Sequence, residues 1–160
     1  MERVNAILNH ETYRHCLGQI RECEKDRIFC HHDMAHFLDV ARLAYLINME
    51  EHMEVSKERI YAAALLHDIG RHLQYLEGIP HEIASGQIAP AILNECGFTE
   101  QETEEIHEAI IRHRDPSVRE KRTLAGLIYR GDKLSRSCFG CSAEELCNWK
   151  KEKKNLKITL

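Results

Sequence analysis

Proline and glycine are scarce in this chain, and the residues between them repeat with the period of an α-helix. The 160 residues include only three prolines and eight glycines. Apolar residues recur at spacings of three and four instead of alternating, which is typical of amphipathic helices and not of half-buried strands. The sequence therefore predicts an all-α fold, a helical bundle with helices at about residues 3–25, 33–54, 57–68, 82–96, 100–113, 118–136 and 143–153.

Several of these helices have recognisable start and stop signals. Thr99 with Glu102, and Ser142 with Glu145, have the spacing of a capping box, in which two side chains satisfy the free N–H groups of a helix start. Gly97 stands where the end of a helix favours a left-handed residue. We therefore expect two of the helices to begin at these boxes and one to end just before Gly97.

Length and composition favour one soluble domain spanning residues 1–160. A mass of 18.6 kDa with 43% apolar residues is enough for one core. No run of eighteen uncharged apolar residues occurs, and the N-terminus lacks the apolar stretch of a signal peptide, so the sequence predicts no membrane association and a cytoplasmic location. A net charge of −4 makes nucleic acid an unexpected partner. No feature specifies an oligomeric state.

Histidine is unusually frequent, and several histidines continue the apolar face of a predicted helix. The chain has eleven histidines. His36, His67, His113 and Asp132 each extend an apolar stripe at spacings of three or four, and Asp68 follows Ala64 by four. One inward histidine alone is more often a hydrogen-bonded core residue than a ligand. Polar groups from four helices, however, must meet one another or share a cation, because burying them unpaired is costly. This pattern favours a divalent metal site.

The residues around these positions resemble a known family. His36 in His-Phe-Leu-Asp-Val-Ala-Arg, the pair His67-Asp68 in Leu-Leu-His-Asp-Ile-Gly-Arg, and Asp132 in Tyr-Arg-Gly-Asp-Lys-Leu are similar to the H...HD...D signature of the HD superfamily of metal-dependent phosphohydrolases. The resemblance covers about residues 30–136 and leaves about 137–160 as a cysteine-containing helix with a basic tail. It implies a helical bundle in which His36, His67, Asp68 and Asp132 bind a metal ion.

Two further histidines resemble the extra ligands of the dinuclear subgroup, found in bacterial HD hydrolases that cleave dinucleoside polyphosphates. These are His81, which follows a turn at Pro80, and His113. The resemblance then implies two divalent ions, with Asp68 bridging them. His107 is a rival for His113, but it lies on another face of the same helix. Four histidines and two aspartates suit Fe, Mn, Co or Zn better than Mg.

The function implied by the resemblance is hydrolysis of a nucleotide or another small phosphoester through metal-activated hydroxide. Asp68, Arg71 and Lys133 are the candidate catalytic residues, the two cations being placed to neutralise charge on phosphoryl oxygens. Arg71 replaces the lysine often found after the HD pair. His72 or His107 is a candidate donor of the leaving-group proton. Two alternatives stay open, an HD-type diiron oxygenase and a non-catalytic nucleotide-binding sensor.

The seven cysteines suggest a second constellation. Cys138, Cys141 and Cys147 have the spacing C-x2-C-x5-C, and a two-residue gap is usual in zinc and iron-sulfur loops. A fourth ligand is missing from the local sequence, and Cys30 or Cys96 could supply it only through tertiary structure. The alternative, favoured at this point, is that these cysteines are reduced structural thiols. Cys16, Cys23 and Cys30 recur every seven residues, which predicts one buried helix face.

Overall fold

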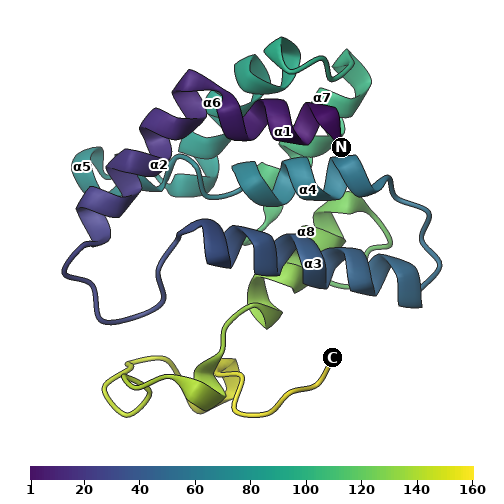
Figure 1. Cartoon of the computed structure of the whole chain (residues 1–160). Helices are drawn as coiled ribbons and strands as arrows, with labels where there is room; N and C mark the ends of the chain where they lie inside the picture. The colour runs from purple at the N-terminus through teal and green to yellow at the C-terminus, as the bar shows by residue number, and fades with distance from the viewer.

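The structure, a computed structural model, describes all residues 1–160 and contains helices and no strands (Figure 1). The all-α prediction is confirmed. None of the helices combines the length and the apolarity needed to cross a membrane. In chain order the elements are α1 (Glu2–Asn9), α2 (Glu11–Glu24), α3 (Met34–Glu50), α4 (Lys57–Leu66), α5 (Arg71–Glu77), α6 (His81–Glu95), α7 (Glu100–Arg112), the 3₁₀ turn η1 (Pro116–Val118), α8 (Leu124–Leu134) and two 3₁₀ turns, η2 (Cys138–Gly140) and η3 (Lys151–Lys153).

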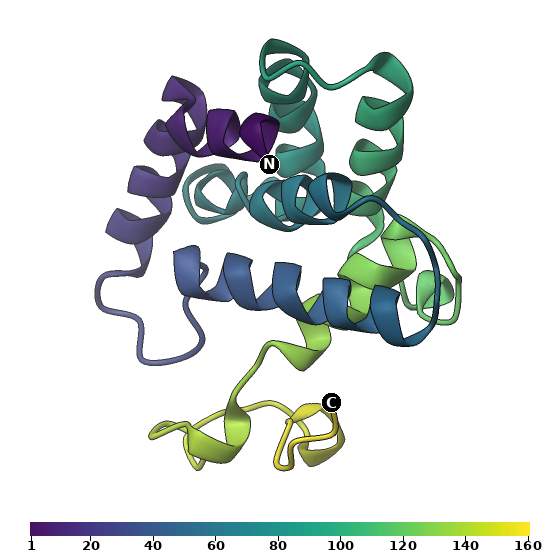
Figure 2. The ribbon, with the colours of Figure 1, turned by 45° about the vertical axis from the view of Figure 1, so that its right-hand side comes forward.

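The core lies where α3, α4, α7 and α8 meet. Helix α3 packs on both α4 and α8, and α7 packs on α4, α6 and α8 (Figure 2). Their facing side chains are almost fully buried and apolar, for example Phe37, Ile60, Ile110 and Ile128. Burial of this apolar surface drives the packing. The same helices carry the predicted metal-binding residues, so the core fixes the site.

The N-terminal helices cover α4 and α5. Arg3 of α1 donates hydrogen bonds to Glu58 of α4 at 2.7 Å and to Glu102 of α7 at 2.7 Å, and so connects three helices. Its guanidinium also lies 4.2 Å from the centre of the Phe98 ring. Thr99 and Glu102 form the expected capping box at the start of α7. Gly97 is left-handed at φ 82°, as its position after α6 predicts.

Two helical predictions in the first half of the chain are corrected. The single helix expected at 3–25 is broken at His10, which has an extended backbone and whose Nδ1 accepts a hydrogen bond from the Thr12 N–H, so that it caps α2. Helix α5 was not predicted. It is one short segment between Gly70 and Gly78, and too few residues lie between these glycines to display a clear period.

The helix expected at 143–153 is absent. This region consists of turns and η3, and Ser142 with Glu145 therefore starts no helix. Little of it packs on the bundle, and helices this short depend on packing for their stability. The buried helix face predicted from the seven-residue repeat of cysteines is also absent, because α2 ends before Cys30. Cys16 is buried and Cys23 half-buried on α2, but Cys30 lies beyond the end of that helix and is exposed.

The closest approach of α3 and α8 depends on Gly131. A Cβ at this position would lie 2.8 Å from the Val40 carbonyl oxygen and 3.2 Å from the Ala44 Cβ. We expect Gly131→Ala to lower the free energy of unfolding by about 1–3 kcal/mol, because the two helices must separate. Gly18→Ala on the exposed face of α2 is the matched control, since nothing lies within 4 Å. It should raise stability by up to about 1 kcal/mol. Urea denaturation of both variants measures this, and equal stability would contradict the account.

Candidate metal centre

The structure brings the six predicted ligands together from the ends of the core helices. His36 lies in the first turn of α3, His67 and Asp68 at the end of α4, and His81 at the start of α6. His113 ends α7 and Asp132 lies in the last turn of α8. Helix ends converge here because α3, α4, α7 and α8 pack around one core. All except the half-buried His36 are buried residues.

Two of the imidazoles are oriented by the helix ends that carry them. The Nδ1–H of His67 donates to the Ala64 carbonyl at 2.7 Å, and that of His113 donates to the Ile110 carbonyl at 2.6 Å. Each bond uses a carbonyl that the helix end leaves free. Because Nδ1 bears the proton in this arrangement, the lone pair of Nε2 faces the centre. This is the orientation that a metal-binding histidine requires.

His36 and His81 are oriented by side chains instead. The Ser135 hydroxyl donates to the Asp132 carbonyl at 2.8 Å, so its oxygen accepts from the Nδ1–H of His36 at 3.3 Å. The Nδ1 of His81 contacts both the Gln74 Oε1 and the Arg71 guanidinium of α5. In both rings Nε2 again faces the centre. Helix α5, which the sequence did not reveal, therefore helps to position a predicted ligand.

The ligand atoms form two groups of three. His36, His67 and Asp132 make one group, and Asp68, His81 and His113 make the other, with the ligand atoms of each group within 4.8 Å of one another. Asp68 faces both. Its Oδ2 lies 3.8 Å from the Nε2 of His36 and 3.4 Å from that of His67, whereas its Oδ1 lies 3.1 Å from His81 and 3.4 Å from His113. A carboxylate in this position can bridge two sites.

The centre contains buried polar atoms that the protein itself does not satisfy. The Nε2 atoms of His36 and His67 and the Oδ1 of Asp68 accept or donate no well-aligned hydrogen bond. Buried polar atoms are normally paired, and several left unpaired at one point call for a further partner such as an ion. The donor set is nitrogen and carboxylate oxygen, which transition metals prefer. The residues therefore fit a divalent metal.

Electrostatics keep the centre ready for a cation. Burial lowers the pKa of His67 to about 4 and that of His81 to about 3, so both rings are neutral at pH 7. Burial would raise the pKa of Asp68 and of Asp132, but nearby imidazoles and, for Asp132, the charge of Lys133 outweigh it, and both pKa values are lowered. The pKa of His113 is raised, because the nearby Asp68 carboxylate, 3.4 Å from its Nε2, outweighs burial.

The centre opens into a cavity of about 630 Å³ lined by six Arg and Lys side chains and five Asp and Glu side chains, two of which are the proposed ligands Asp68 and Asp132. Arg71 and Lys133 both line it. The Arg71 Nη1 lies 2.8 Å from the Nδ1 of His81, and the Lys133 ammonium pairs with Asp132. The other basic residues on the cavity wall are Arg27, Arg114, Arg136 and Lys154. Such a wall suits an anionic ligand.

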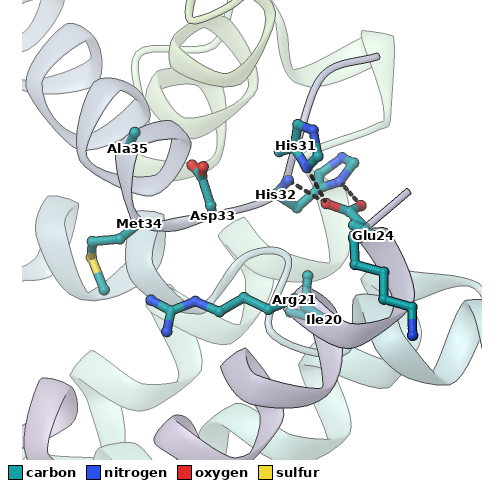
Figure 3. Close-up of a pocket in the computed structure, with 9 residues that line it drawn as sticks. Ile20, Arg21, Glu24, His31, His32, Asp33, Met34 and Ala35 are labelled. Carbon is teal, nitrogen blue, oxygen red and sulfur yellow. Dashed lines mark hydrogen bonds and ion pairs between the residues drawn. The ribbon is translucent and has the colours of Figure 1, made fainter. Parts of the chain in front are cut away.

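One pair at the centre was missed in the sequence. His32 lies in the loop before α3, and its Nε2 is 3.8 Å from the Oδ2 of Asp68. Its Nδ1 is held by Glu24, the last residue of α2, to which Tyr75 also donates at 2.6 Å. Figure 3 shows the Glu24 carboxylate beside His31 and His32 on the wall of a smaller cavity. Hydrogen bonds from His32 and Tyr75 outweigh burial and lower the pKa of Glu24 to about 2. The spacing of His32, four residues before His36, indicates that it could reach the mouth of the cavity, but no local signal indicates Glu24 as its partner.

The two other candidate histidines lie elsewhere. His107 packs against Gly86 of α6, and His72 is buried on α5. Neither lines the cavity, so neither is placed to donate a proton to a leaving group. The position of each residue around the helix therefore predicted correctly that His113, and not His107, faces the centre.

Comparison with known proteins places the chain in a family. The pattern of the HD domain family matches residues 34–137. An uncharacterized protein of Clostridium beijerinckii is 49% identical over 158 residues, which are 99% of each chain. A crystal structure described as a predicted HD superfamily hydrolase from an uncultured Thermotogales bacterium is 26% identical and superposes with a TM-score of 0.62 over 89% of this chain and 81% of that one. Together with the two His/Asp groups, these matches show that the chain belongs to the HD domain family and that its chemistry is of the metal-dependent hydrolase class.

Proposed function

We propose that this protein is a phosphohydrolase that cleaves a small phosphorylated substrate, such as a nucleotide, with two divalent ions bound at the centre. The observation that carries the proposal is the pair of adjacent His/Asp groups with Asp68 between them, at the base of a basic cavity. His36, His67 and Asp132 would hold one ion, and His81 and His113 the other. Metal ions at such a centre activate water and polarise phosphoryl oxygens.

The protein's own side chains would bind and orient the phosphate. Arg71 presents a planar guanidinium, which matches two phosphate oxygens at once. Lys133 of α8 presents a point charge beside Asp132. His32 is fixed by Glu24 on one nitrogen, so its other nitrogen is available to a substrate oxygen in the cavity. These groups would stabilise negative charge as it develops on the phosphoryl group.

A panel of phosphoesters tests this function. Protein purified without chelators is incubated with Mn, Fe, Co, Zn or Mg and with nucleotides and other small phosphoesters. Product phosphate should carry oxygen from labelled water, and turnover should continue without dioxygen. Turnover that stops under anaerobic conditions, with the metal bound and in the same redox state, would replace hydrolysis with oxygenase chemistry. Tight nucleotide binding without turnover would support the sensor alternative.

Arg71 and Lys133 should affect turnover without affecting metal content. We expect Arg71→Ala and Lys133→Ala each to lower kcat/KM by about tenfold or more, the scale of losing one contact that stabilises charge in the transition state. Metal content and melting temperature of the metal-loaded enzymes should stay near those of wild type. Arg119→Ala is the control, because Arg119 is exposed and distant from the cavity lining. Full activity in the Arg71 and Lys133 variants would contradict these assignments.

A further inference from the structure

The segment after α8, residues 137–160, has little apolar packing. It lies beneath α3 in both views and includes only the turns η2 and η3 (Figures 1 and 2). Ala143 is its only buried residue, whereas Phe139, Leu146 and Trp149 are exposed. Fixing each residue costs about 1–2 kcal/mol of backbone entropy. Hydrophobic burial does not offset that cost here, so the segment needs another source of order.

A few contacts attach the segment to the end of α8. The Asn155 side chain donates to the carbonyls of Lys133, Leu134 and Arg136, which the end of α8 leaves free. The Arg136 guanidinium lies 4.0 Å from the centre of the Trp149 ring. Small regions without a core commonly depend on disulfides or on a metal ion. All seven cysteines of this chain are free thiols.

Consecutive turns shape the stretch that carries three of these thiols. The Cys141 N–H donates to the Cys138 carbonyl at 3.3 Å, the Glu144 N–H to the Cys141 carbonyl at 3.2 Å, and the Cys147 N–H to the Glu144 carbonyl at 3.2 Å. The first of these turns brings the ends of the C-x2-C pair close together, because a four-residue turn keeps its outer Cα atoms within about 7 Å. This is the local geometry of a chelating loop.

The structure also supplies the fourth cysteine. Cys30 lies in the loop between α2 and α3, and it lines the same cavity as Cys138, Cys141 and Cys147. Although Cys30 as a whole is exposed, partial burial of its thiol, and then the neighbouring thiol of Cys138, raise the pKa of that thiol. Cys96, the other sequence candidate, is buried at the end of α6 and does not line the cavity. Of the two cysteines considered as the fourth ligand, the structure therefore places Cys30, and not Cys96, on the same cavity wall as the other three.

We propose that Cys30, Cys138, Cys141 and Cys147 bind one tetrahedral zinc-type cation, separate from the His/Asp centre. Four thiolates complete such a site, which is structural and leaves no open position. The ion would connect the loop before α3 to the C-terminal segment and hold that segment over the cavity. No three of the four sulfur atoms lie within 4.8 Å of one another, as the ligands of each His/Asp group do, so binding would require the turns and the loop of Cys30 to draw together. Arg136 and Lys154, on the same cavity wall, would offset the negative charge of the thiolates.

Cobalt substitution tests the proposal independently of the hydrolase. Full-length protein is loaded with Co²⁺ under reducing conditions, and the near-ultraviolet absorption is recorded, because only thiolate ligands give a strong sulfur-to-cobalt band there. We expect this band in wild type and in Asp68→Ala, where the His/Asp centre is disrupted. The band should be absent from Cys30→Ser and from Cys138→Ser. When these variants are purified without cobalt, they should also lack the one equivalent of tightly bound zinc that wild type carries. Cys23→Ser, on α2 and outside the cavity, is the matched control and should keep both.

Trp149 provides a second measurement, because it is the only tryptophan and lies within the segment. Chelation of zinc from wild type should free its ring from the contact with Arg136 and change its emission, with the helical circular dichroism unchanged. The same emission should be found in Cys30→Ser without chelation. Two cobalt results would overturn the proposal: no thiolate-to-cobalt band in wild type, or a band retained in Cys30→Ser. A Cys138–Cys141 disulfide in protein kept free of air would also overturn it, as would iron with labile sulfide in place of zinc.

Discussion

Asp68→Ala should release the bound metal, abolish turnover and lower the melting temperature, all in one variant. Asp68 is the only one of the six residues whose atoms face both groups, with Oδ2 towards His36 and His67 and Oδ1 towards His81 and His113. Losing it removes a ligand from each ion. A metal ion present at a free concentration of a hundred times its dissociation constant stabilises the folded state by about 2.7 kcal/mol. A loss of about 3 kcal/mol corresponds to roughly 6–12 °C in a domain of this size.

Elemental analysis after gel filtration, thermal denaturation and the phosphoester assay measure these three effects. Asp26→Ala removes an exposed carboxylate from the turn after α2 and should match wild type in all of them. Wild type stripped of metal should have a melting temperature well below that of its metal-loaded form and close to the one expected for the Asp68 variant. An Asp68 variant that keeps two ions and measurable turnover would show that Asp68 is not the bridging ligand.

Complete removal of metal should abolish turnover reversibly and leave the helices folded. The helices should persist because the remaining charges are paired within the protein: Lys133 pairs with Asp132, and His113, with its raised pKa, pairs with Asp68. Activity should return with Mn, Fe, Co or Zn and far less with Mg, because four of the six ligand residues are imidazoles. Titration of each metal into the stripped enzyme measures this, with circular dichroism as the control for folding. Full turnover in metal-free protein would contradict the proposed mechanism.

The sequence predicted the centre because most of its residues lie at helical spacing on the apolar faces of their helices. His36, His67, His113 and Asp132 each continue an apolar stripe, and stripes of neighbouring helices must face one core. His81 has no such stripe and came from the family resemblance alone. The structure brings all five together with Asp68. Helical periodicity therefore predicted the site better than it predicted the helix boundaries.

What the sequence did not reveal depends on contacts between distant residues. Glu24 holds His32 from eight residues away, across the end of a helix, and no local spacing predicts that pair. His10 ends α1 by adopting an extended backbone although its neighbours on both sides favour helix. The region 143–153 contains helix-forming residues but lacks a packed face, so the local preference does not prevail.

Anomalous X-ray diffraction from crystals of metal-loaded protein tests the central claim most directly, because it places each ion and identifies its element. The account predicts two peaks at the His/Asp centre, one among His36, His67 and Asp132 and one between His81 and His113, with Asp68 contacting both. Any peak at the cysteines would be separate from these. A single peak at the centre, with His81 and His113 turned away from it, would contradict the dinuclear site.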